Sequence, residues 1–382
     1  MPSTEELRRV VAGVAPACVE LRRALHRRPE LSNKEYATSR LVADTLNEAG
    51  IPARIREAGV GVLADIGGGD TIVAFRADLD GLPIHEANEV TYASAVAGRM
   101  HACGHDVHAA IGVGIALALN RLGIDGSVRF IFQHAEEGTH GGASDMVSEG
   151  AMEGVGAILA FHVDPSLEAG RIGLRTGAIT SSSDRFEITV EGPGGHTGRP
   201  HETVDTIYAA SLVATQVPAL LQRLVDSRRP MAVAFGQVHG GTADNVIPAR
   251  VELSGTARAL DRKLWEELPG LVDQLANDVV APTGAKAVVH YQRGIPPVIN
   301  SAKVIAEVEF AVVEALGGEA VSDTEPSLGA EDFARFLDHA EGAMVRLGAA
   351  LTERRALHAS NFDVDEASIE TGILVGAASL LR

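Results

Sequence analysis

The sequence predicts an α/β protein of two domains, in which the second domain is inserted into the first. Helical periodicity alternates with short apolar strands over residues 1–182, which is typical of a sheet covered by helices. From Ser183 the order becomes strand, helix, strand, strand, helix, strand, and it is complete in itself by residue 295. Helix and strand patterns resume over 296–382, so we expect the first domain to be completed there.

The elements of the first domain follow from apolar spacing and from glycine and proline positions. A glycine-rich turn at 67–70 joins two strands and opens no helix, so we interpret it as a hairpin-type connection and not as a phosphate loop. Before the insertion we expect helices over 4–27, 33–49 and 109–122 and strands over 60–66, 71–77, 127–133 and 157–161. After it we expect a helix over 301–316, a strand over 343–347 and a helix over 365–381.

The inserted segment has the β-α-β-β-α-β order of a ferredoxin-like domain. A loop rich in glycine and histidine, 192–201, separates its first strand from its first helix. The expected strands cover 186–191, 231–238, 249–257 and 285–292, and the expected helices cover 203–225 and 261–280.

Composition and charge exclude several classes of function. The 382 residues are 46% hydrophobic and 22% charged, as in an ordinary globular protein. The net charge of −18 argues against binding to nucleic acid or to an anionic membrane. No secretory signal and no membrane-spanning apolar run is visible. The two cysteines, Cys18 and Cys103, make no disulfide framework, so we expect a cytoplasmic protein.

The segment 99–108, Arg-Met-His-Ala-Cys-Gly-His-Asp-Val-His, is the centre of the functional prediction. Thiolates and neutral imidazoles are good ligands for divalent metals, although a lone cluster of this kind can be a hydrogen-bonded turn with a buried cysteine. Its spacing alone does not choose between His101, His105 and His108 as ligands.

Further candidate ligands follow other predicted strands. Glu136 and Glu137 come directly after a buried strand, where two carboxylates are costly unless a cation or proton compensates them. His162 ends the next strand, and His358 lies in a late loop. Asp78 and Asp80 end an earlier strand, where they either orient ligand histidines or cap a turn. We expect these ends to meet at one edge of the sheet.

These motifs together resemble the M20 family of metal-dependent peptidases and amidohydrolases, in the branch of aminoacylases, hippurate hydrolases and auxin-conjugate hydrolases. The Cys-Gly-His motif is specific to that branch. The resemblance implies an α/β catalytic domain with an inserted lid and dimerisation domain. The matching segments lie in order along nearly the whole chain: 25–31, 76–83, 100–106, 135–138, 194–196, 239–242, 245–248, 329–333 and 357–358.

The resemblance also implies roles for individual residues. It makes Cys103, His105, Glu137, His162 and His358 ligands of two divalent ions, either Mn²⁺ or Zn²⁺, and it makes Glu136 the general base. His196 and Asn245 would meet the substrate carbonyl or carboxylate, with His196 acting in catalysis from its own subunit or from the partner of a homodimer.

The chain departs from the family pattern at two positions that bear on the substrate. Arg199 lies in the loop after the Gly-Gly-His motif, where it is either a carboxylate clamp or a solvated cation. His134 stands where the family usually has proline before Ala-Glu-Glu.

The expected activity is hydrolysis of N-acyl amino acids by a metal-activated water. The alternative of the same fold is a dipeptidase or aminopeptidase-like enzyme. A binding protein on an inactive hydrolase fold should have lost a ligand or the base, and none is lost. A serine hydrolase is disfavoured because the sequence has no Gly-x-Ser-x-Gly elbow, and a metal-bound Cys103 is no free nucleophile.

Overall fold

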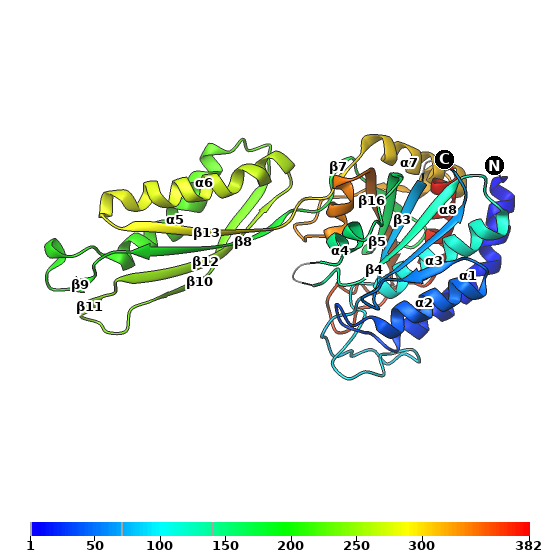
Figure 1. Ribbon diagram of the computed structural model, residues 1–382, viewed down its shortest axis with the longest axis horizontal. Coiled ribbons are helices and arrows are strands. Elements are labelled where there is room, and N and C mark those ends of the chain that lie inside the picture. Colours follow the sequence, from blue (N-terminus) through cyan, green and yellow to red (C-terminus); the bar gives the residue numbers. More distant parts are fainter. Residues whose placement is uncertain (1, 70–71, 139–140) are drawn as a thin grey trace. The chain divides into compact units, whose positions relative to one another are not determined.

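The computed structural model describes residues 2–69, 72–138 and 141–382, and its internal contacts divide the chain into two compact units. Both units combine helices and strands, so the α/β class predicted from the sequence is confirmed (Figure 1). Unit 2 includes a short segment, Pro326–Glu331, that no sequence pattern connected with the insertion. Unit 1 comprises Met1–Gly177, Ile299–Glu325 and Asp332–Arg382, and unit 2 comprises Ala178–Val298 and Pro326–Glu331.

The sheet of unit 1 has eight strands in the order β1-β2-β4-β3-β5-β16-β6-β15. Its strands are β1 (Ala53–Ile55), β2 (Val62–Gly67), β3 (Ile72–Asp78), β4 (Ser127–Gln133), β5 (Val155–Glu168), β6 (Ile172–Leu174), β15 (Val321–Asp323) and β16 (Glu341–Ala350). The central strands β4, β3, β5 and β16 are parallel to one another, whereas β2 is antiparallel to β4. The carboxyl ends of the four central strands therefore share one edge, where α/β folds commonly place their sites.

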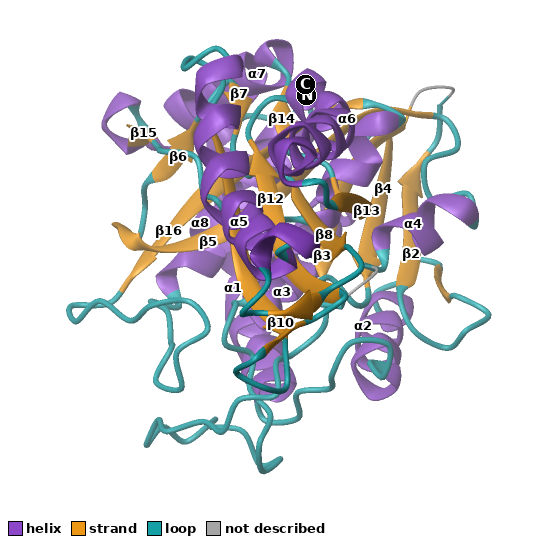
Figure 2. Cartoon of the chain, turned by 90° about the vertical axis from the view of Figure 1, so that its left-hand side faces the viewer, coloured by secondary structure: helices purple, strands orange, loops and turns teal. Residues whose placement is uncertain are grey.

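Helices pack against this sheet and against one another (Figures 1 and 2). They are α1 (Thr4–His26), α2 (Tyr36–Glu48), α3 (His105–Leu122), α4 (Ala143–Ser148), α7 (Ala302–Leu316) and α8 (Ala367–Leu380). Helix α3 is apolar nearly all round and almost wholly buried, as expected for a core helix. Gly114 lets α8 approach it closely, since a Cβ there would lie 2.3 Å from Ile373 Cδ1. The core thus fixes the helix whose first residue is His105.

The predicted hairpin-type connection at 67–70 is wrong, because β4 lies between β2 and β3 in the sheet. Two of the element boundaries that differ from the prediction concern the site. Helix α3 begins at His105 and not at residue 109, because Gly104 adopts φ +85° as the residue before the helix. Strand β5 continues past His162 to Glu168, because β16 pairs with it along this stretch. That pairing partner is remote in sequence, so the apolar run 157–161 could not show it.

Unit 2 contains the predicted β-α-β-β-α-β order. Its elements are β8 (Ser183–Glu191), α5 (Thr206–Leu224), β10 (Met231–Gly240), β12 (Arg250–Ala259), α6 (Arg262–Val280) and β13 (Lys286–Ile295). The antiparallel sheet has the order β10-β12-β8-β13, and the apolar sides of α5 and α6 pack on it in a separate core. A two-stranded ladder joins β9 (Gly195–His196) to β11 (Val246–Ile247).

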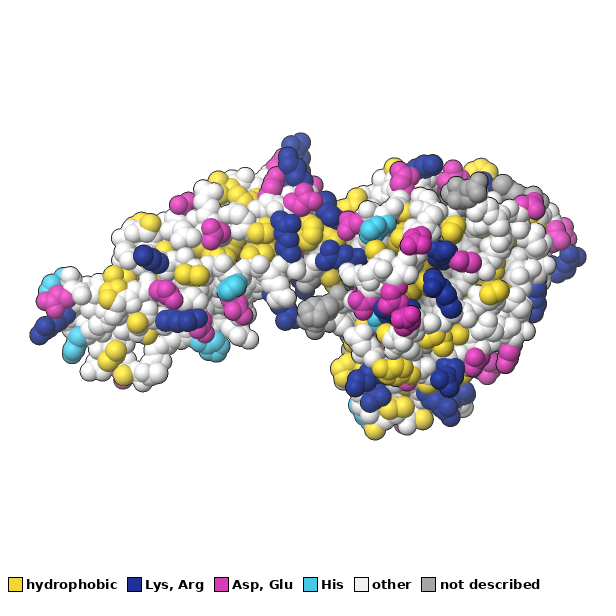
Figure 3. All heavy atoms as spheres, in the orientation of Figure 1, with side chains coloured by type: hydrophobic (Ala, Val, Ile, Leu, Met, Phe, Trp, Pro, Cys, Tyr) yellow, Lys and Arg dark blue, Asp and Glu magenta, His cyan; other side chains and the backbone are white. Residues whose placement is uncertain are grey.

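The remaining elements are short. They are β7 (Gly177–Ala178), β14 (Ile299–Asn300) and the 3₁₀ turns η1 (Pro200–Glu202), η2 (Ala281–Thr283), η3 (Gly318–Ala320) and η4 (Asp332–Asp338). On the face drawn in Figure 3, acidic, basic and apolar side chains are interspersed. Among the helices of the described ranges, none is long and apolar enough to cross a bilayer.

Candidate metal centre and active site

The structure brings the five candidate ligands and the candidate base together in unit 1. Their places in the fold differ: Glu136 and Glu137 follow the carboxyl end of β4, His162 lies within β5, Cys103 comes just before α3, His105 begins α3, and His358 lies in a loop before α8. Short distances join them in a chain, from His162 to Cys103, to His358, to Glu137, and through a second group to His105 and Glu136. The predicted residues do come together, but His162 reaches the site from within β5 and not from its end.

Cys103 lies between two imidazoles. Its Sγ is 3.5 Å from His162 Nε2 and 3.4 Å from His358 Nε2, and His358 Nε2 is 3.1 Å from Glu137 Oε1. His162 Nδ1 donates to the carbonyl of Val163 at 2.8 Å, which leaves Nε2 with its lone pair facing the sulfur. Burial raises the pKa of the Cys103 thiol to about 12, so a thiolate here requires a neighbouring cation.

Within the described residues, His105 presents one nitrogen without a hydrogen-bond partner. Its Nδ1 lies 3.1 Å from Asp80 Oδ1, whereas its buried Nε2 has no hydrogen-bond partner within the described ranges. Ligand atoms of His105, Glu136 and Glu137 lie within 4.8 Å of one another, and those of Cys103, Glu137 and His358 form a second such group. An orphaned imidazole nitrogen, a buried thiol and shared carboxylates form a donor set that fits a pair of divalent cations.

The hydrogen bonds of His108 exclude it as a ligand. Its Nδ1 donates to Asp78 Oδ1 at 2.7 Å, and its Nε2 accepts from the backbone N–H of Val163 at 2.9 Å. With both nitrogens used, His108 fastens α3 to β3 and β5. His101 is buried, and burial lowers its pKa to about 4, but no group of potential ligands in the described ranges includes it. His105 is therefore the histidine of the segment 99–108 that faces other ligands.

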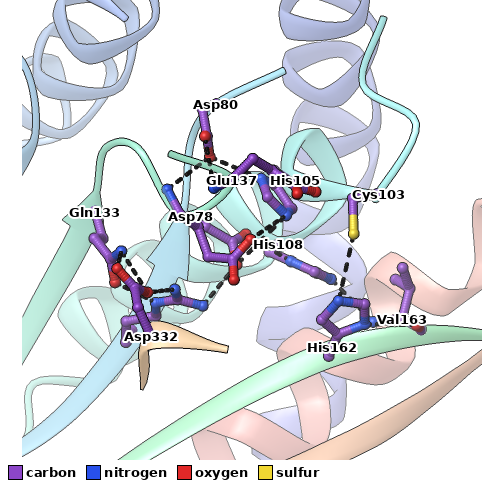
Figure 4. A network of polar contacts seen from close by, with 12 residues as sticks. Asp78, Asp80, Cys103, His105, His108, Gln133, Glu137, His162, Val163 and Asp332 are labelled. Carbon is purple, nitrogen blue, oxygen red and sulfur yellow. Dashed lines mark hydrogen bonds and ion pairs between the residues drawn. The ribbon is translucent and has the colours of Figure 1, made fainter. Parts of the chain in front are cut away.

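Asp80 orients both the imidazole and the backbone of the site (Figure 4). It accepts from Ser32 Oγ at 2.7 Å and from the backbone N–H groups of Glu136 and Glu137 at 3.2 and 3.0 Å. Burial alone would raise the pKa of Asp80, but the hydrogen bonds from His105, Ser32 and Glu137 lower it. These contacts support the role of Asp80 in orienting the ligands, and not that of a simple turn cap.

A buried arginine compensates Asp78, the last residue of β3. Arg76 donates to Asp78 at 2.6 Å and to Asp332 at 3.0 Å, and all three side chains are almost fully buried. Gln133 at the end of β4 donates to Asp332, and the backbone N–H of Ala143 donates to the same carboxylate. Burial raises the pKa of Asp78, but His105, His108 and Arg76 hold it well below its usual value. This network holds the ends of β3 and β4 together beneath the ligands.

The backbone is strained at one candidate ligand, His358, and at Ala135, the residue before Glu136. Ala135 has φ +52° and His358 has φ +63°, a region that costs about 1–2 kcal/mol for a residue with a Cβ. Gly104 has φ +85°, and a Cβ there would lie 2.4 Å from Val163 Cγ2. Such conformations persist only where surrounding contacts impose them, and they concentrate at functional sites.

A charged network behind the site was not foreseen from the sequence. Arg22 Nε donates to Asp106 Oδ2 at 2.7 Å, and Arg22 Nη2 donates to Asp363 Oδ1 at 2.8 Å. His26 Nδ1 lies 2.8 Å from Asp106 Oδ2, and His26 Nε2 lies 3.1 Å from Glu86 Oε1. Burial would lower the pKa of His26, but Asp106 and Glu86 raise it to about 9. No local pattern marks this network, because its members come from α1, α3 and two loops.

His134, the departure beside the base, does not join the metal group. Its ring is buried, with Nε2 2.9 Å from Arg56 Nη1 and 3.4 Å from Asp145 Oδ2. Burial and Arg56 lower its pKa. The structure thus places His134 in a polar contact with Arg56, which itself pairs with Glu149.

The candidates of the inserted segment lie in unit 2. His196 Nδ1 accepts from the backbone N–H of Gly198 at 2.9 Å, so Nε2 carries the proton and is the available donor. Asn245 is adjacent, since its carbonyl accepts from Thr197 N at 3.2 Å beside the β9–β11 ladder. Gly194 has φ +63°, and a Cβ there would lie 2.6 Å from the Ile247 carbonyl, which explains one glycine of the Gly-Gly-His motif.

Arg199 lines an exposed cavity together with His196. A cavity of about 430 Å³ is lined by Gly195, His196, Gly198, Arg199, Glu202 and Thr203. Arg199 is exposed, and its Nη1 lies 3.4 Å from Glu202 Oε2. Since these residues belong to unit 2, their action on a substrate held by unit 1 is a proposal.

Comparisons with known proteins agree with this geometry. The family model "Peptidase family M20/M25/M40" matches residues 74–382. The chain is 43% identical over 378 residues to a probable hydrolase of Synechocystis sp., covering 97% of this chain and 96% of that protein. It is 39% identical over 300 residues to an N-acyl-L-amino acid amidohydrolase of Geobacillus stearothermophilus, covering 78% and 81%.

A solved structure is similar along nearly its whole length. It is a dinuclear metal binding peptidase of the M20 family from Bacillus subtilis, with 32% identity and a TM-score of 0.86, and the match covers 97% of this chain and 98% of that one. The resemblance noted in the motifs is thereby confirmed. The donor set in unit 1, the family model and these relatives lead to one conclusion: the chain belongs to the M20 family of peptidases and amidohydrolases.

Proposed function

We propose that the protein is a metal-dependent amidohydrolase that cleaves the amide bond of N-acyl amino acids. The observation that carries this proposal is the convergence of Cys103, His105, Glu137, His162 and His358, with Glu136 beside His105 and Glu137 and the Nε2 of His105 left without a hydrogen-bond partner in the described part of the chain. The similarity to an N-acyl-L-amino acid amidohydrolase supports the substrate class.

The proposed mechanism assigns one task to each side chain. Two divalent ions, Mn²⁺ or Zn²⁺, would be held by the five ligands, and when bound they would lower the pKa of a water and polarise the amide carbonyl. Glu136, whose Oε2 is 3.8 Å from His105 Nε2, takes the proton from the water and passes it to the leaving amine. Asp80 keeps His105 in the tautomer with Nε2 free and holds the amides of Glu136 and Glu137.

Unit 2 would supply the groups that meet the substrate. The Nε2–H of His196 is available to donate to the developing oxyanion, and Asn245 lies beside it. Arg199 would bind the substrate carboxylate at the exposed cavity. We further propose that this unit is the lid and the dimerisation domain of a cytoplasmic homodimer, whose partner subunit supplies His196 if the chain's own copy does not.

The two neighbouring glutamates allow a matched test. Glu136→Gln should lower the turnover rate by about 10²–10⁴-fold, the usual contribution of a general base, and leave the metal content unchanged. Glu137→Gln, its neighbour and control, should lower both the metal content and the rate. Elemental analysis and hydrolysis of N-acetyl amino acids with added Mn²⁺ or Zn²⁺ measure the two effects. A Glu136→Gln enzyme of parental rate, or a Glu137→Gln enzyme with full metal content, contradicts the assignment.

A second candidate function is peptide hydrolysis, which the peptidase described for the similar Bacillus subtilis structure favours. The same site would cleave either bond, because both are amides beside a carboxylate. A panel of N-acetyl amino acids, N-benzoyl amino acids and dipeptides separates them. A kcat/KM for dipeptides well above that for the N-acyl amino acids would replace the first proposal by the second.

A further inference from the structure

Glu35 is a fully buried carboxylate that none of the proposed roles uses. It directly precedes α2, and its side chain is 0% exposed. Its Oε1 accepts from the backbone N–H of Ala135 at 2.7 Å and from that of Asn33 at 3.1 Å, and its Oε2 has no hydrogen-bond partner within the described residues. A carboxylate buried in this way is costly, so its contact with residue 135, one hundred positions away, calls for a reason.

The contact lies at the strained residue before the base. Ala135 adopts φ +52° and is almost fully buried. Its carbonyl accepts from Gly138 N at 3.3 Å, while its N–H is bound by Glu35. An alanine does not hold this left-handed conformation by itself, so outside contacts must impose it. Glu35 is one of these contacts.

Three consecutive backbone N–H groups then bind two buried carboxylates. Ala135 donates to Glu35, whereas Glu136 and Glu137 donate to the two oxygens of Asp80. Ser32, three residues before Glu35, donates to the same Asp80. The turn before α2 thus touches the 135–137 backbone twice, directly through Glu35 and indirectly through Ser32.

We infer that Glu35 is a positioning residue that holds Ala135 in its left-handed conformation and thereby aims Glu136 and Glu137 into the metal centre. It acts through the backbone, since its side-chain hydrogen bonds within the described residues go to the N–H groups of Asn33 and Ala135 and to no candidate ligand. If Ala135 relaxed to an ordinary φ, the next two N–H groups would turn away from Asp80, and Glu137 would lose its place beside His358. Both metal affinity and the alignment of the base depend on this turn.

The inference rests on the proposed function for its catalytic part, but its metal part can be measured without any turnover. Glu35→Ala should weaken metal binding and lower kcat at saturating metal, each by about 10–100-fold, as for other groups that orient ligands. Glu35→Gln should restore both values to within about threefold, because its amide oxygen accepts from Ala135 N in the same place. Affinity is read by competition with a chromogenic chelator, and kcat is read with an N-acetyl amino acid.

Glu30→Ala is the matched control. Glu30 also accepts a backbone bond at the start of α2, from Thr38 N at 2.7 Å, but the structure shows no bond from it to the 135–137 segment among the described contacts. Its loss should lower the thermal midpoint and leave metal affinity within about threefold. If Glu35→Ala changes affinity no more than Glu30→Ala does at equal loss of thermal midpoint, the role is merely structural and the inference is overturned.

A double variant tests the conformational step itself. Glycine adopts positive φ without strain, so Ala135→Gly in the Glu35→Ala background should recover several-fold of the lost metal affinity. Failure of the double variant to recover any affinity overturns the claim that Glu35 acts through Ala135. Should Glu35→Ala not fold, Glu35→Asp gives the same test, since its shorter side chain keeps the charge and withdraws the oxygen from Ala135 N. Wild-type protein that binds metal but hydrolyses no amide refutes the proposed function alone.

Discussion

The buried pair of His26 and Asp106 should make the free energy of unfolding depend on pH. His26 is fully buried between Asp106 at 2.8 Å and Glu86 at 3.1 Å, and its pKa is raised from 6.5 to about 9. A histidine with a raised pKa in the folded state stabilises the fold fully below its unfolded pKa of 6.5. That contribution is lost as the pH rises through 9. A shift of this size corresponds to about 3 kcal/mol, since one pKa unit is worth about 1.4 kcal/mol.

The assay is urea unfolding of the metal-free protein at pH 6 and at pH 9.5, followed by far-UV circular dichroism. Wild type should lose about 3 kcal/mol more than His26→Gln between the two pH values, because the variant has no proton to lose. Trp265, the only tryptophan of the sequence, lies in unit 2, so its fluorescence identifies the part of the transition that belongs to that unit. An equal pH dependence in wild type and variant would refute the assignment of a buried imidazolium.

Two further predictions concern the metal centre. Burial raises the pKa of Cys103 to about 12, so metal loading at pH 8 must release its proton, and Cys103→Ala should release about one proton fewer per subunit. An indicator dye measures the protons released on metal loading. An unchanged number of released protons would exclude the sulfur as a ligand. Gly104→Ala should weaken metal binding by about 10-fold or more. The residue has φ +85° and a Cβ would lie 2.4 Å from Val163 Cγ2, so the substitution would displace Cys103 and His105. Chelator competition measures the metal affinity, and an affinity equal to wild type would show that the turn tolerates a Cβ.

The sequence by itself determined the class of fold, most element positions and the chemical identity of the candidate ligands. These features are local: apolar spacing predicts helices and strands, and a cysteine beside histidines or two adjacent glutamates after a strand can be read from neighbouring residues. The resemblance to a family then chose His105 among the three histidines of the segment 99–108. The alternation of strands with such residues also predicted that their ends would meet at one edge.

Only the tertiary structure decided how each polar group is used. His108 is excluded as a ligand by the N–H of Val163, 55 residues away, and His162 lies inside β5 because a distant strand pairs there. Glu35 falls within the helix predicted over 33–49, and no sequence pattern marks it, yet it binds a strained turn 100 residues further on. Such partners are set by the packing of segments far apart in the chain. A single sequence records the residue types but not the burial that forces a buried polar group to find its partner.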